Sequence, residues 1–328
     1  MTRRRPNLGD LLLTAAVNAA NAPPAPFFYG GQAVIEGVLM RGRNRYAVAA
    51  RRPDGTITVI TERLRSRVYT NRLWALPFFR GVASLYEMLN LGMRALQWSA
   101  NVQLGDEVEM SAATMRVTIA ISVVFGIALF IGLPLGIASL LHHGAPQSPL
   151  WVLVEGAARA AILLLYLLLI GQVRSVSRVF EYHGAEHKAI NCLESGVAVD
   201  VLAVRACSRL HPRCGTGFLL IVALVSILVF IPLSPLFWPV RIACEIVLVP
   251  FVAAIAYELI RGLARIRHTR FGRIALGPVL ATQLLTTREP DASQMEVAIA
   301  ALAAARSGDG GRGGAGEAHD PLAGARVP

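Results

Sequence analysis

The sequence predicts an α-helical membrane protein with four transmembrane helices, a small cytosolic β-rich module before them and a cytosolic helical loop between the second and the third. Three observations favour this class. The chain of 328 residues is 54% hydrophobic and only 16% charged, whereas a soluble domain carries about 25% charged residues. Its apolar residues gather in four long runs, and most of its arginines lie outside those runs. A lipid environment therefore explains the composition better than one large soluble core.

The N-terminal segment, residues 1–26, is expected to be a retained leader that is partly disordered. Three arginines, Arg3 to Arg5, precede an apolar stretch that is too short for the core of a cleaved signal peptide. The pair of arginines also lacks the apolar residues that a twin-arginine signal would need directly after it.

Residues 27–70 are expected to form the β-rich cytosolic module. Two β-prone runs, 46–50 and 56–60, flank the sequence Pro53-Asp54-Gly55. Proline fixes one backbone angle and glycine supplies a positive one, so this order predicts a hairpin turn. The glycine-rich stretch 30–42 lacks the Lys and Ser/Thr of a phosphate-binding loop and is interpreted as tight turns.

Residues 71–115 contain apolar and aromatic patches that charged residues interrupt, a pattern typical of helices at a membrane surface. The four long apolar runs follow. A helix needs about 20 residues to cross the hydrocarbon core of a bilayer, and each run is close to that length. The predicted spans are 117–141 and 150–173 within residues 116–173, and 218–238 and 240–260 within residues 217–260.

The distribution of basic residues predicts the orientation of the spans. Residues 1–115 hold 14 arginines, and the loop 174–216 holds five arginines and Lys188, the only lysine of the chain. The short connections between the first and second spans and between the third and fourth spans hold neither. The positive-inside rule therefore places the N-terminus, the central loop and the C-terminus in the cytosol, with the protein in the cell membrane.

Two pairs of opposite charges lie inside the predicted spans, and each pair is four residues apart. Glu155 and Arg159 are in the second span, and Arg241 and Glu245 are in the fourth. Both pairs fall near the outer ends of their helices, so we expect one polar cluster between the helices. Buried charges in membranes are often functional, but a structural lock is the interpretation we favour.

The C-terminal part, residues 261–306, is expected to be a cytosolic segment that ends in a helix at 293–305. Ser293 followed by Glu296 predicts a capping box at the start of that helix. Residues 307–328 are rich in glycine and alanine and are expected to be disordered.

The sequence His183-Gly184-Ala185-Glu186-His187 is the clearest candidate for chemistry. It lies on a predicted helix from about 177 to 193, so the two imidazoles project from one face and can share a metal ion. The order H-x-x-E-H is that of the inverted zinc hydrolases, in which two His bind zinc and the Glu is the general base. A solvated helix face with two surface histidines is the alternative.

A second group of metal-ligand residue types lies in the same loop. Cys207, His211 and Cys214 precede the third span, and His211 and Cys214 stand three apart ahead of a glycine turn. The cytosol is reducing, so these cysteines are expected to be free thiols or metal ligands. If His183, His187, His211 and Cys214 all bound one ion, the site would be full and structural.

An open coordination position beside Glu186 would instead make hydrolysis possible. Glu258, at the cytosolic end of the fourth span, is another candidate ligand, and Glu194 shares the helix face of the two histidines. Glu36 and Arg41 of the glycine-rich stretch could also face the site, because that stretch is expected on the same side of the membrane. The expected cofactor is a divalent metal, with zinc favoured by this set of ligands.

Four stretches of the chain resemble the YqhQ family of uncharacterised bacterial membrane proteins, whose members are commonly labelled as metal-dependent enzymes. The resemblance spans about residues 28–304 and is carried by the segments 30–42, 182–188, 211–216 and 285–290. Leu39, Gly217 and Gly277-Pro278 depart from the expected motifs, and none of them is a candidate ligand. The resemblance implies the same domain but no substrate.

Two hypotheses follow, and both have the lipid bilayer as the surroundings of the protein. The first is a metal-dependent membrane enzyme, a hydrolase, in which Glu186 is the general base. The second is a non-enzymatic scaffold or assembly factor whose closed metal site holds the central loop. A transporter is less favoured because inverted repeats are absent from the sequence. Nucleic acid is not an expected partner, because no aromatic-studded basic stripe accompanies the net charge of +11.

Overall fold

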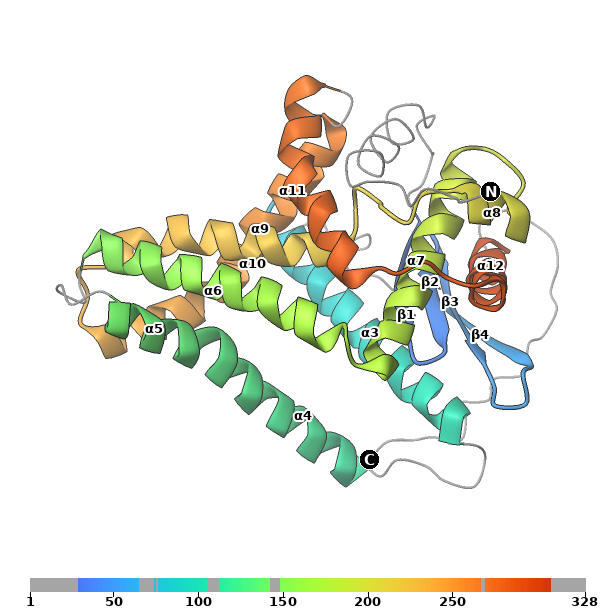
Figure 1. Ribbon diagram of the computed structural model, residues 1–328, viewed down its shortest axis with the longest axis horizontal. Coiled ribbons are helices and arrows are strands. Elements are labelled where there is room, and N and C mark those ends of the chain that lie inside the picture. The colour runs from blue at the N-terminus through green and yellow to red at the C-terminus, as the bar shows by residue number, and fades with distance from the viewer. Residues whose placement is uncertain are drawn as a thin grey trace, which may run out of the picture.

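The computed structural model describes residues 29–64, 74, 76–104, 112–141, 148–266 and 269–307. The predicted leader and almost all of the predicted C-terminal tail lie outside these ranges. A head domain, built from a β-sheet and the helices α3, α7, α8 and α12, lies at one end of a bundle of long apolar helices (Figure 1). The two parts meet where α6 leads into α7.

The β-sheet has four antiparallel strands in the order β1-β2-β3-β4. The strands are β1 (Gly30–Val34), β2 (Gly37–Arg41), β3 (Arg45–Arg51) and β4 (Ile57–Arg63). The predicted hairpin is confirmed: it joins β3 to β4, Gly55 has a φ of 88°, and the Asp54 carboxylate accepts a hydrogen bond from the Thr56 backbone at 2.8 Å. The interpretation of residues 30–42 as tight turns was wrong, because this stretch forms the β1–β2 hairpin around a two-residue turn, Ile35-Glu36.

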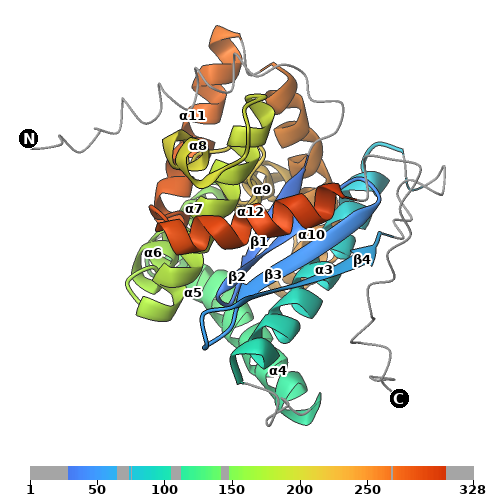
Figure 2. The ribbon, with the colours of Figure 1, turned by 90° about the vertical axis from the view of Figure 1, so that its right-hand side faces the viewer.

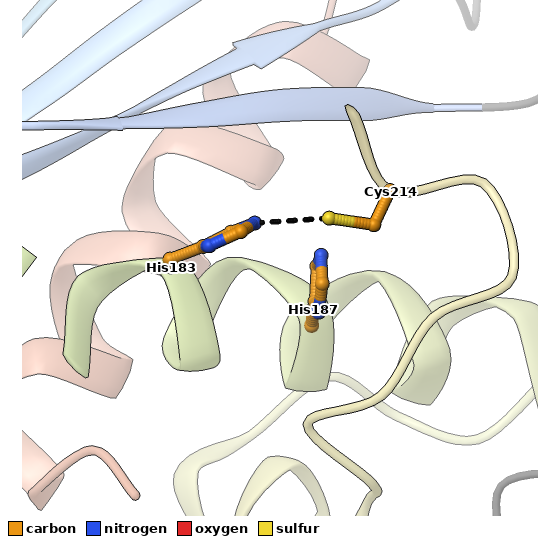
Figure 3. Close-up of side chains that lie close together, drawn as sticks. All are labelled: His183, His187 and Cys214. Carbon is orange, nitrogen blue, oxygen red and sulfur yellow. Dashed lines mark hydrogen bonds between the residues drawn. The ribbon is translucent and has the colours of Figure 1, made fainter. Parts of the chain in front are cut away.

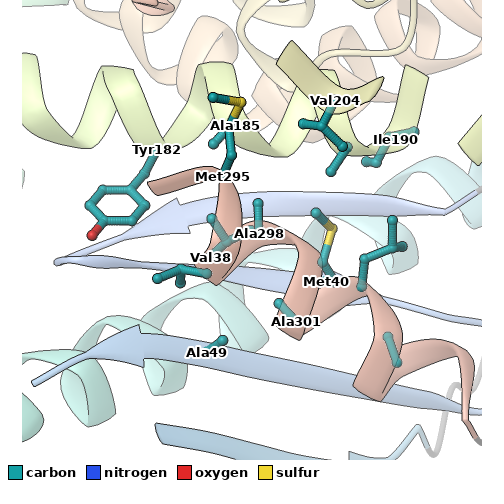
Figure 4. Close-up of a cluster of buried hydrophobic side chains, with 14 of the residues drawn as sticks. Val38, Met40, Ala49, Tyr182, Ala185, Ile190, Val204, Met295, Ala298 and Ala301 are labelled. Carbon is teal, nitrogen blue, oxygen red and sulfur yellow. The ribbon is translucent and has the colours of Figure 1, made fainter. Parts of the chain in front are cut away.

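Both faces of the sheet are buried. Successive side chains of a strand point to opposite faces, and both sets are apolar here. Val38, Met40 and Ala49 belong to the core shared with α7 and α12, which Figure 4 shows, whereas Leu39 and Val48 belong to the core on the side of α3. Helix α12 lies across the first of these faces (Figure 2). The sheet is therefore the middle layer of a three-layer head.

The region expected to hold interfacial helices contains one long helix, α3 (Phe79–Leu104), among the residues that the structure describes. Leu91 and Ala95 on one side of α3 pack on the sheet. Near its N-terminal end, Gly81 lies against Tyr257 and Arg80 pairs with Glu258. Helix α3 therefore connects the head to α10 of the bundle.

Four stretches of helix are long and apolar enough to cross a membrane, as far as length and composition can decide. They overlap the four predicted spans, but the third ends at Leu233 and not at residue 238, because the fourth already begins at Trp238. The first joins α4 (Ala112–Ile127), the π-helical η1 (Ala128–Gly132) and α5 (Leu133–Leu141); the others are α6 (Pro149–Ile170), α9 (Gly215–Phe230) with η2 (Ile231–Leu233), and α10 (Trp238–Arg265). A core centred on Val152, Ile221, Val225 and Val252 packs α6, α9 and α10 together.

The predicted polar cluster between α6 and α10 is confirmed. The Glu155 carboxylate accepts from Arg159 at 2.7 Å and from Arg241 at 2.8 Å, and Glu245 lies 3.3 Å from Arg241 and 3.5 Å from Arg159. Two carboxylates and two guanidinium groups thus balance in charge. The side chains of Glu155, Arg241 and Glu245 are almost completely buried, and that of Arg159 is 15% exposed.

The same cluster holds the proline-containing first span. Pro134 has no N–H to donate to the carbonyl four residues earlier, which is that of Phe130. Arg159 Nε donates to this carbonyl at 3.0 Å. A side chain from a neighbouring helix thus satisfies the carbonyl that proline leaves open, as membrane helices require.

The remaining helices are α7 (Arg174–Glu194), α8 (Val201–Ala206), α11 (Arg270–Thr286) and α12 (Ala292–Arg306). The predicted helices at 177–193 and 293–305 correspond to α7 and α12. The capping box was predicted at the wrong residues: Asp291 is the N-cap, and it exchanges hydrogen bonds with Gln294, not Ser293 with Glu296. The chain is still extended at Asp291, so the helix begins just after it and Glu296 instead pairs with Arg51.

Candidate metal centre

Helix α7 carries the two predicted histidines on one face. Residues four apart on a helix lie one above the other, and the His183 and His187 rings accordingly have centroids 4.4 Å apart. The opposite face of α7 holds Ala185, Ala189 and Cys192 in the head core. Packing of this apolar face fixes the rotation of the helix and turns both imidazoles toward the junction with the bundle.

Cys214 completes a group of three potential ligands. It is the N-cap residue of α9, and its thiol lies 3.3 Å from His183 Nε2. Figure 3 shows the two rings and the thiol converging on one point. Among the described residues, His183, His187 and Cys214 form the group whose ligand atoms all lie within 4.8 Å of one another.

Backbone carbonyls orient both histidine rings. His183 Nδ1 lies 2.8 Å from the Thr286 carbonyl, and His187 Nδ1 lies 2.6 Å from the Arg209 carbonyl. A carbonyl can only accept, so each Nδ1 carries a proton, and Nε2 is the nitrogen that has a free lone pair whenever the ring is neutral. Histidines that bind metals are commonly held in this way by their other ring nitrogen.

Polar side chains of α7 also hold the loop that leads to Cys214. Lys188 Nζ donates to the carbonyls of Arg205 and Cys207, both at 2.9 Å. Asn191 Nδ2 donates to the carbonyls of Ser208 at 2.7 Å and Leu210 at 3.0 Å. One polar face of α7 therefore supplies two ligands and also fixes the backbone that carries the third.

The segment after α11 crosses α7 at Gly184. A Cβ at this glycine would collide with the Arg288 carbonyl, and the Arg288 N–H donates to the Phe180 carbonyl at 2.9 Å. This close crossing brings the Thr286 carbonyl to His183. Thr286 Oγ1 also bonds to Thr216 Oγ1 at 3.0 Å, and Thr216 Oγ1 lies 3.1 Å from the Cys214 thiol.

The predicted general base, Glu186, lies beside this group. Its carboxylate is 3.9 Å from His183 Nε2 and is almost completely buried. The side chain extends toward strand β1, where a Cβ on Gly31 would meet its Cγ at 2.8 Å. Gly31 therefore gives the carboxylate room, and its backbone N–H is one of the groups that bond to it.

Burial and the neighbouring charges together shift the pKa values in the centre. Burial raises the pKa of the Glu186 carboxyl, and the charges of His187 and His183 oppose that rise. For Cys214, burial favours the neutral thiol, but the charges and hydrogen bonds of His187 and His183 outweigh burial and bring the pKa well below its usual value. Burial also disfavours a charged His183, but Cys214 outweighs it and raises the His183 pKa to about 9.

His211 lies next to this group but is not part of it. Its ring centroid is 5.7 Å from that of His187, and its Nε2 is 3.8 Å from Glu194 Oε1. Burial lowers the pKa of His211 to about 4, and its Nε2 has no hydrogen-bond partner within the described part of the chain. Its backbone exchanges two hydrogen bonds with the Gln283 side chain, at 2.9 and 2.8 Å.

Other candidates from the sequence have different partners. Glu258 accepts two hydrogen bonds from Arg80, and Glu194 pairs with Arg213. Glu36 pairs with Arg178 and Tyr182, and Arg41 with Glu87. Glu258 is thus turned toward α3, because the nearby guanidinium compensates its charge where the head meets the bundle. Cys207 lies beside Cys192, outside the three-ligand group.

Sequence reasoning missed several residues that shape the centre. They are Gly31, Gly184, Thr216 and Thr286, together with the Arg209 carbonyl. All but Arg209 fall within or directly beside the long motifs quoted above, yet nothing in a single sequence indicates which backbone atom will meet which ring. One signal was available in the sequence. Lys188 is the sole lysine of the chain and directly follows the second histidine, which indicates that this position has a specific partner.

Most of the chain is similar to known sequences. The family described as "Protein of unknown function (DUF1385)" matches residues 76–307. The chain is 33% identical over 294 residues to "Uncharacterized protein YqhQ" of Bacillus subtilis (strain 168), and this alignment covers 84% of the chain and 91% of the relative. No solved structure matches. The family match includes the three potential ligands, Glu186 and the four apolar helices.

Proposed function

The chain belongs to the DUF1385 family and is similar over most of its length to the YqhQ protein, and from this premise we propose that it is a metal-dependent membrane hydrolase. His183, His187 and Cys214 bind the metal, and Glu186 is the general base. The observation that carries the proposal is the convergence of three ligand atoms within 4.8 Å beside a buried carboxylate.

The chemistry of the three ligands fits zinc. Imidazole and thiolate are the usual nitrogen and sulfur ligands of this ion, and catalytic zinc sites typically have three protein ligands and one open position. A closed structural site has four. His211, which would have been the fourth ligand, lies outside the group, and this favours a catalytic centre over a structural one.

A zinc ion in this centre would supply Lewis acidity and would lower the pKa of a nearby water molecule. Glu186 accepts the proton that this water loses, and its burial raises the affinity of the carboxylate for that proton. The oxygen of this water would bond to the substrate, and Glu186 would return the proton to the leaving group as the scissile bond breaks. Gly31 N–H holds the carboxylate in place.

The four apolar helices cross the cell membrane, and the head lies in the cytosol. Support comes from their length and hydropathy and from the basic residues. Arginines flank the head ends of the helices, whereas the described link Ser234–Phe237, at the opposite end of the bundle, holds none. The metal centre then lies at the cytosolic membrane surface, because Cys214 directly precedes α9.

Metal content and a conservative change of the base test the enzyme proposal. The full-length protein is purified in mild detergent without chelators, and metals are measured by mass spectrometry. We expect one zinc per chain in the wild type and in Glu186→Gln, and a loss of zinc in His183→Ala and Cys214→Ala. Cys244→Ala is the matched control, because Cys244 lies outside the ligand group, and it should keep its zinc.

The same variants are then expressed in a strain that lacks the gene. Glu186→Gln should fail to restore the phenotype of the deletion although it retains zinc. A wild-type protein that contains no transition metal overturns the proposal. Full restoration by Glu186→Gln, together with loss of zinc in His211→Ala, supports the alternative in which a closed metal site holds the central loop of a non-enzymatic scaffold.

A further inference from the structure

An apolar cavity of about 370 Å³ lies among the four candidate membrane-spanning helices. It is bordered by η1, α6, α9 and α10, and almost all of the atoms that line it are apolar. Pockets for small ligands typically measure about 300–1,000 Å³, so the cavity is large enough for part of a ligand.

One face of α9 connects the cavity to the metal centre. Leu219, Val222, Ser226 and Phe230 line the cavity and are spaced three or four residues apart, so they form a single row about 16 Å long at 1.5 Å per residue. The row continues by one turn to Thr216, whose hydroxyl lies 3.1 Å from the Cys214 thiol. The near end of the cavity is thus only about 7.5 Å along the helix axis from Cys214.

The far end of the cavity does not offer a charge to a ligand. The Arg159 guanidinium lies 5.7 Å from the centroid of the Phe230 ring, which covers it, and it pairs with Glu155 and Glu245. These groups belong to the balanced cluster described above. A ligand that reaches this end therefore meets an aromatic ring and paired charges, and a hydrocarbon end fits there better than a charged one.

The first candidate span leaves a side of the bundle open. Helix α4 leans away from α6, α9 and α10 (Figure 1), and none of its described side chains is buried. Only Phe130 and Ile131 of η1 reach the cavity from this span. In a bilayer, lipid chains would surround α4 and could enter the cavity sideways.

We infer that the cavity holds a hydrocarbon chain of a membrane lipid, and that the substrate of the hydrolase is a lipid whose polar part reaches the Cys214 end. Water is an unfavourable occupant, because it would find few polar partners in the cavity. An empty cavity is also unfavourable, because the atoms of its walls would lose dispersion contacts. The chain-binding site stands on the cavity alone, whereas the assignment of the substrate rests on the proposed function.

Photolabelling tests the chain-binding site. The full-length protein is reconstituted in phosphatidylglycerol nanodiscs that contain a phosphatidylglycerol with a diazirine in one acyl chain, and labelled residues are mapped by mass spectrometry. We expect labels on the row from Leu219 to Phe230. Ala223→Phe, which fills the cavity, should lower them about tenfold, equal to about 1.4 kcal/mol of lost binding. Leu224→Phe on the exposed side of α9 is the matched control and should leave them unchanged.

A second filling variant, Ser226→Leu, keeps the test decisive if Ala223→Phe fails to fold. Among the described residues, the Ser226 hydroxyl bonds only to the Ala223 carbonyl one turn away, at 2.8 Å. If neither filling variant reduces the labelling, the inference is overturned. A row that the lipid does not label in the wild type overturns it as well, in favour of a second copy of the chain as the occupant.

Lipid that co-purifies with the Glu186→Gln protein tests the substrate. This variant should retain a lipid class that the wild type lacks, and adding Ala223→Phe should remove it. If zinc is present but the row is not labelled, the proposed function stands and the cavity inference fails. If the row is labelled but zinc is absent, the chain-binding site stands and the hydrolase fails.

Discussion

At the scale of single residues, two glycines decide how closely the segments around the candidate metal centre can approach. Gly31 gives room to the Glu186 side chain, and Gly184 lets the Arg288 carbonyl lie directly on α7. Neither glycine has a positive φ. Glycine is therefore required at both positions because a Cβ would not fit, and not because of the backbone conformation. Both positions therefore act on the centre through packing.

Gly184→Ala should displace the segment 286–290 from α7. The new methyl group collides with a backbone carbonyl, which cannot rotate away as a side chain can. We expect a destabilisation of about 1–3 kcal/mol. We also expect about 10–100-fold weaker zinc binding, because the Thr286 carbonyl loses its place at His183. Thermal denaturation and zinc titration measure the two effects.

Gly262→Ala is the control for this substitution. Gly262 is also in a helix, and nothing lies within 4 Å of a Cβ built there. Alanine favours a helix over glycine by roughly 0.5–1 kcal/mol, so this variant should be unchanged or slightly more stable. Equal losses in the two variants would contradict a specific role for the crossing at Gly184.

At the scale of elements, the charged cluster and the proline of the first span form one unit. Arg159 of α6 compensates the carboxylates of Glu155 and Glu245 and also bonds to the carbonyl of Phe130. Three of the four candidate spans thus meet at one guanidinium group. The spacing of the charges predicted this cluster, and its role as a structural lock stays a prediction.

Arg159→Leu should destabilise the bundle by about 3–5 kcal/mol, because removing one partner of a buried ion pair leaves an uncompensated charge. Replacing Glu245 by Leu in the same protein restores the charge balance and should recover most of the loss. Adding Pro134→Ala supplies an N–H for the Phe130 carbonyl and should recover more. Unfolding in mixed detergent measures the series, and a double variant no more stable than Arg159→Leu would contradict the lock.

The elements that sequence periodicity could predict were the long and regular ones. Local patterns predicted three kinds of element: four runs of about 20 apolar residues, the hairpin at Pro53-Asp54-Gly55 and the helix with the two histidines. The capping box was misplaced by two residues because Asp291 and Ser293 are both good caps, and only the end of the extended segment decides between them.

The partners of the centre could be predicted only in part. His183, His187 and Cys214 were all candidates, since their residue types and spacing are typical of metal ligands. Which of His211, Cys214 and Glu258 would join the pair depends on contacts between segments far apart in sequence. Arg80 turns Glu258 away across 178 residues of chain, and no local pattern contains that information.

At the scale of the whole molecule, the orientation in the membrane can be tested with cysteine labelling. Leu236→Cys lies in the link between the third and fourth candidate spans, and Ser195→Cys lies at the end of α7. In intact cells, a maleimide that cannot cross the membrane should label Leu236→Cys only. Ser195→Cys should react only after the membrane is permeabilised, as the positive-inside rule predicts.

The wild-type chain, with its four native cysteines, is the control and should not react in intact cells. Labelling of Ser195→Cys in intact cells would place the head and its metal centre outside the cytosol. It would contradict the proposed topology while leaving the geometry of the centre unchanged.

The head is assembled from both ends of the sequence. Its core combines strands near the N-terminus, α7 from the middle and α12 near the C-terminus, and the segment before α12 positions His183. During synthesis the strands and α7 therefore leave the ribosome long before α12 does. A nascent chain cannot complete the head until α12 has been synthesised, so a product truncated before α12 would contain the four apolar helices but lack an assembled head.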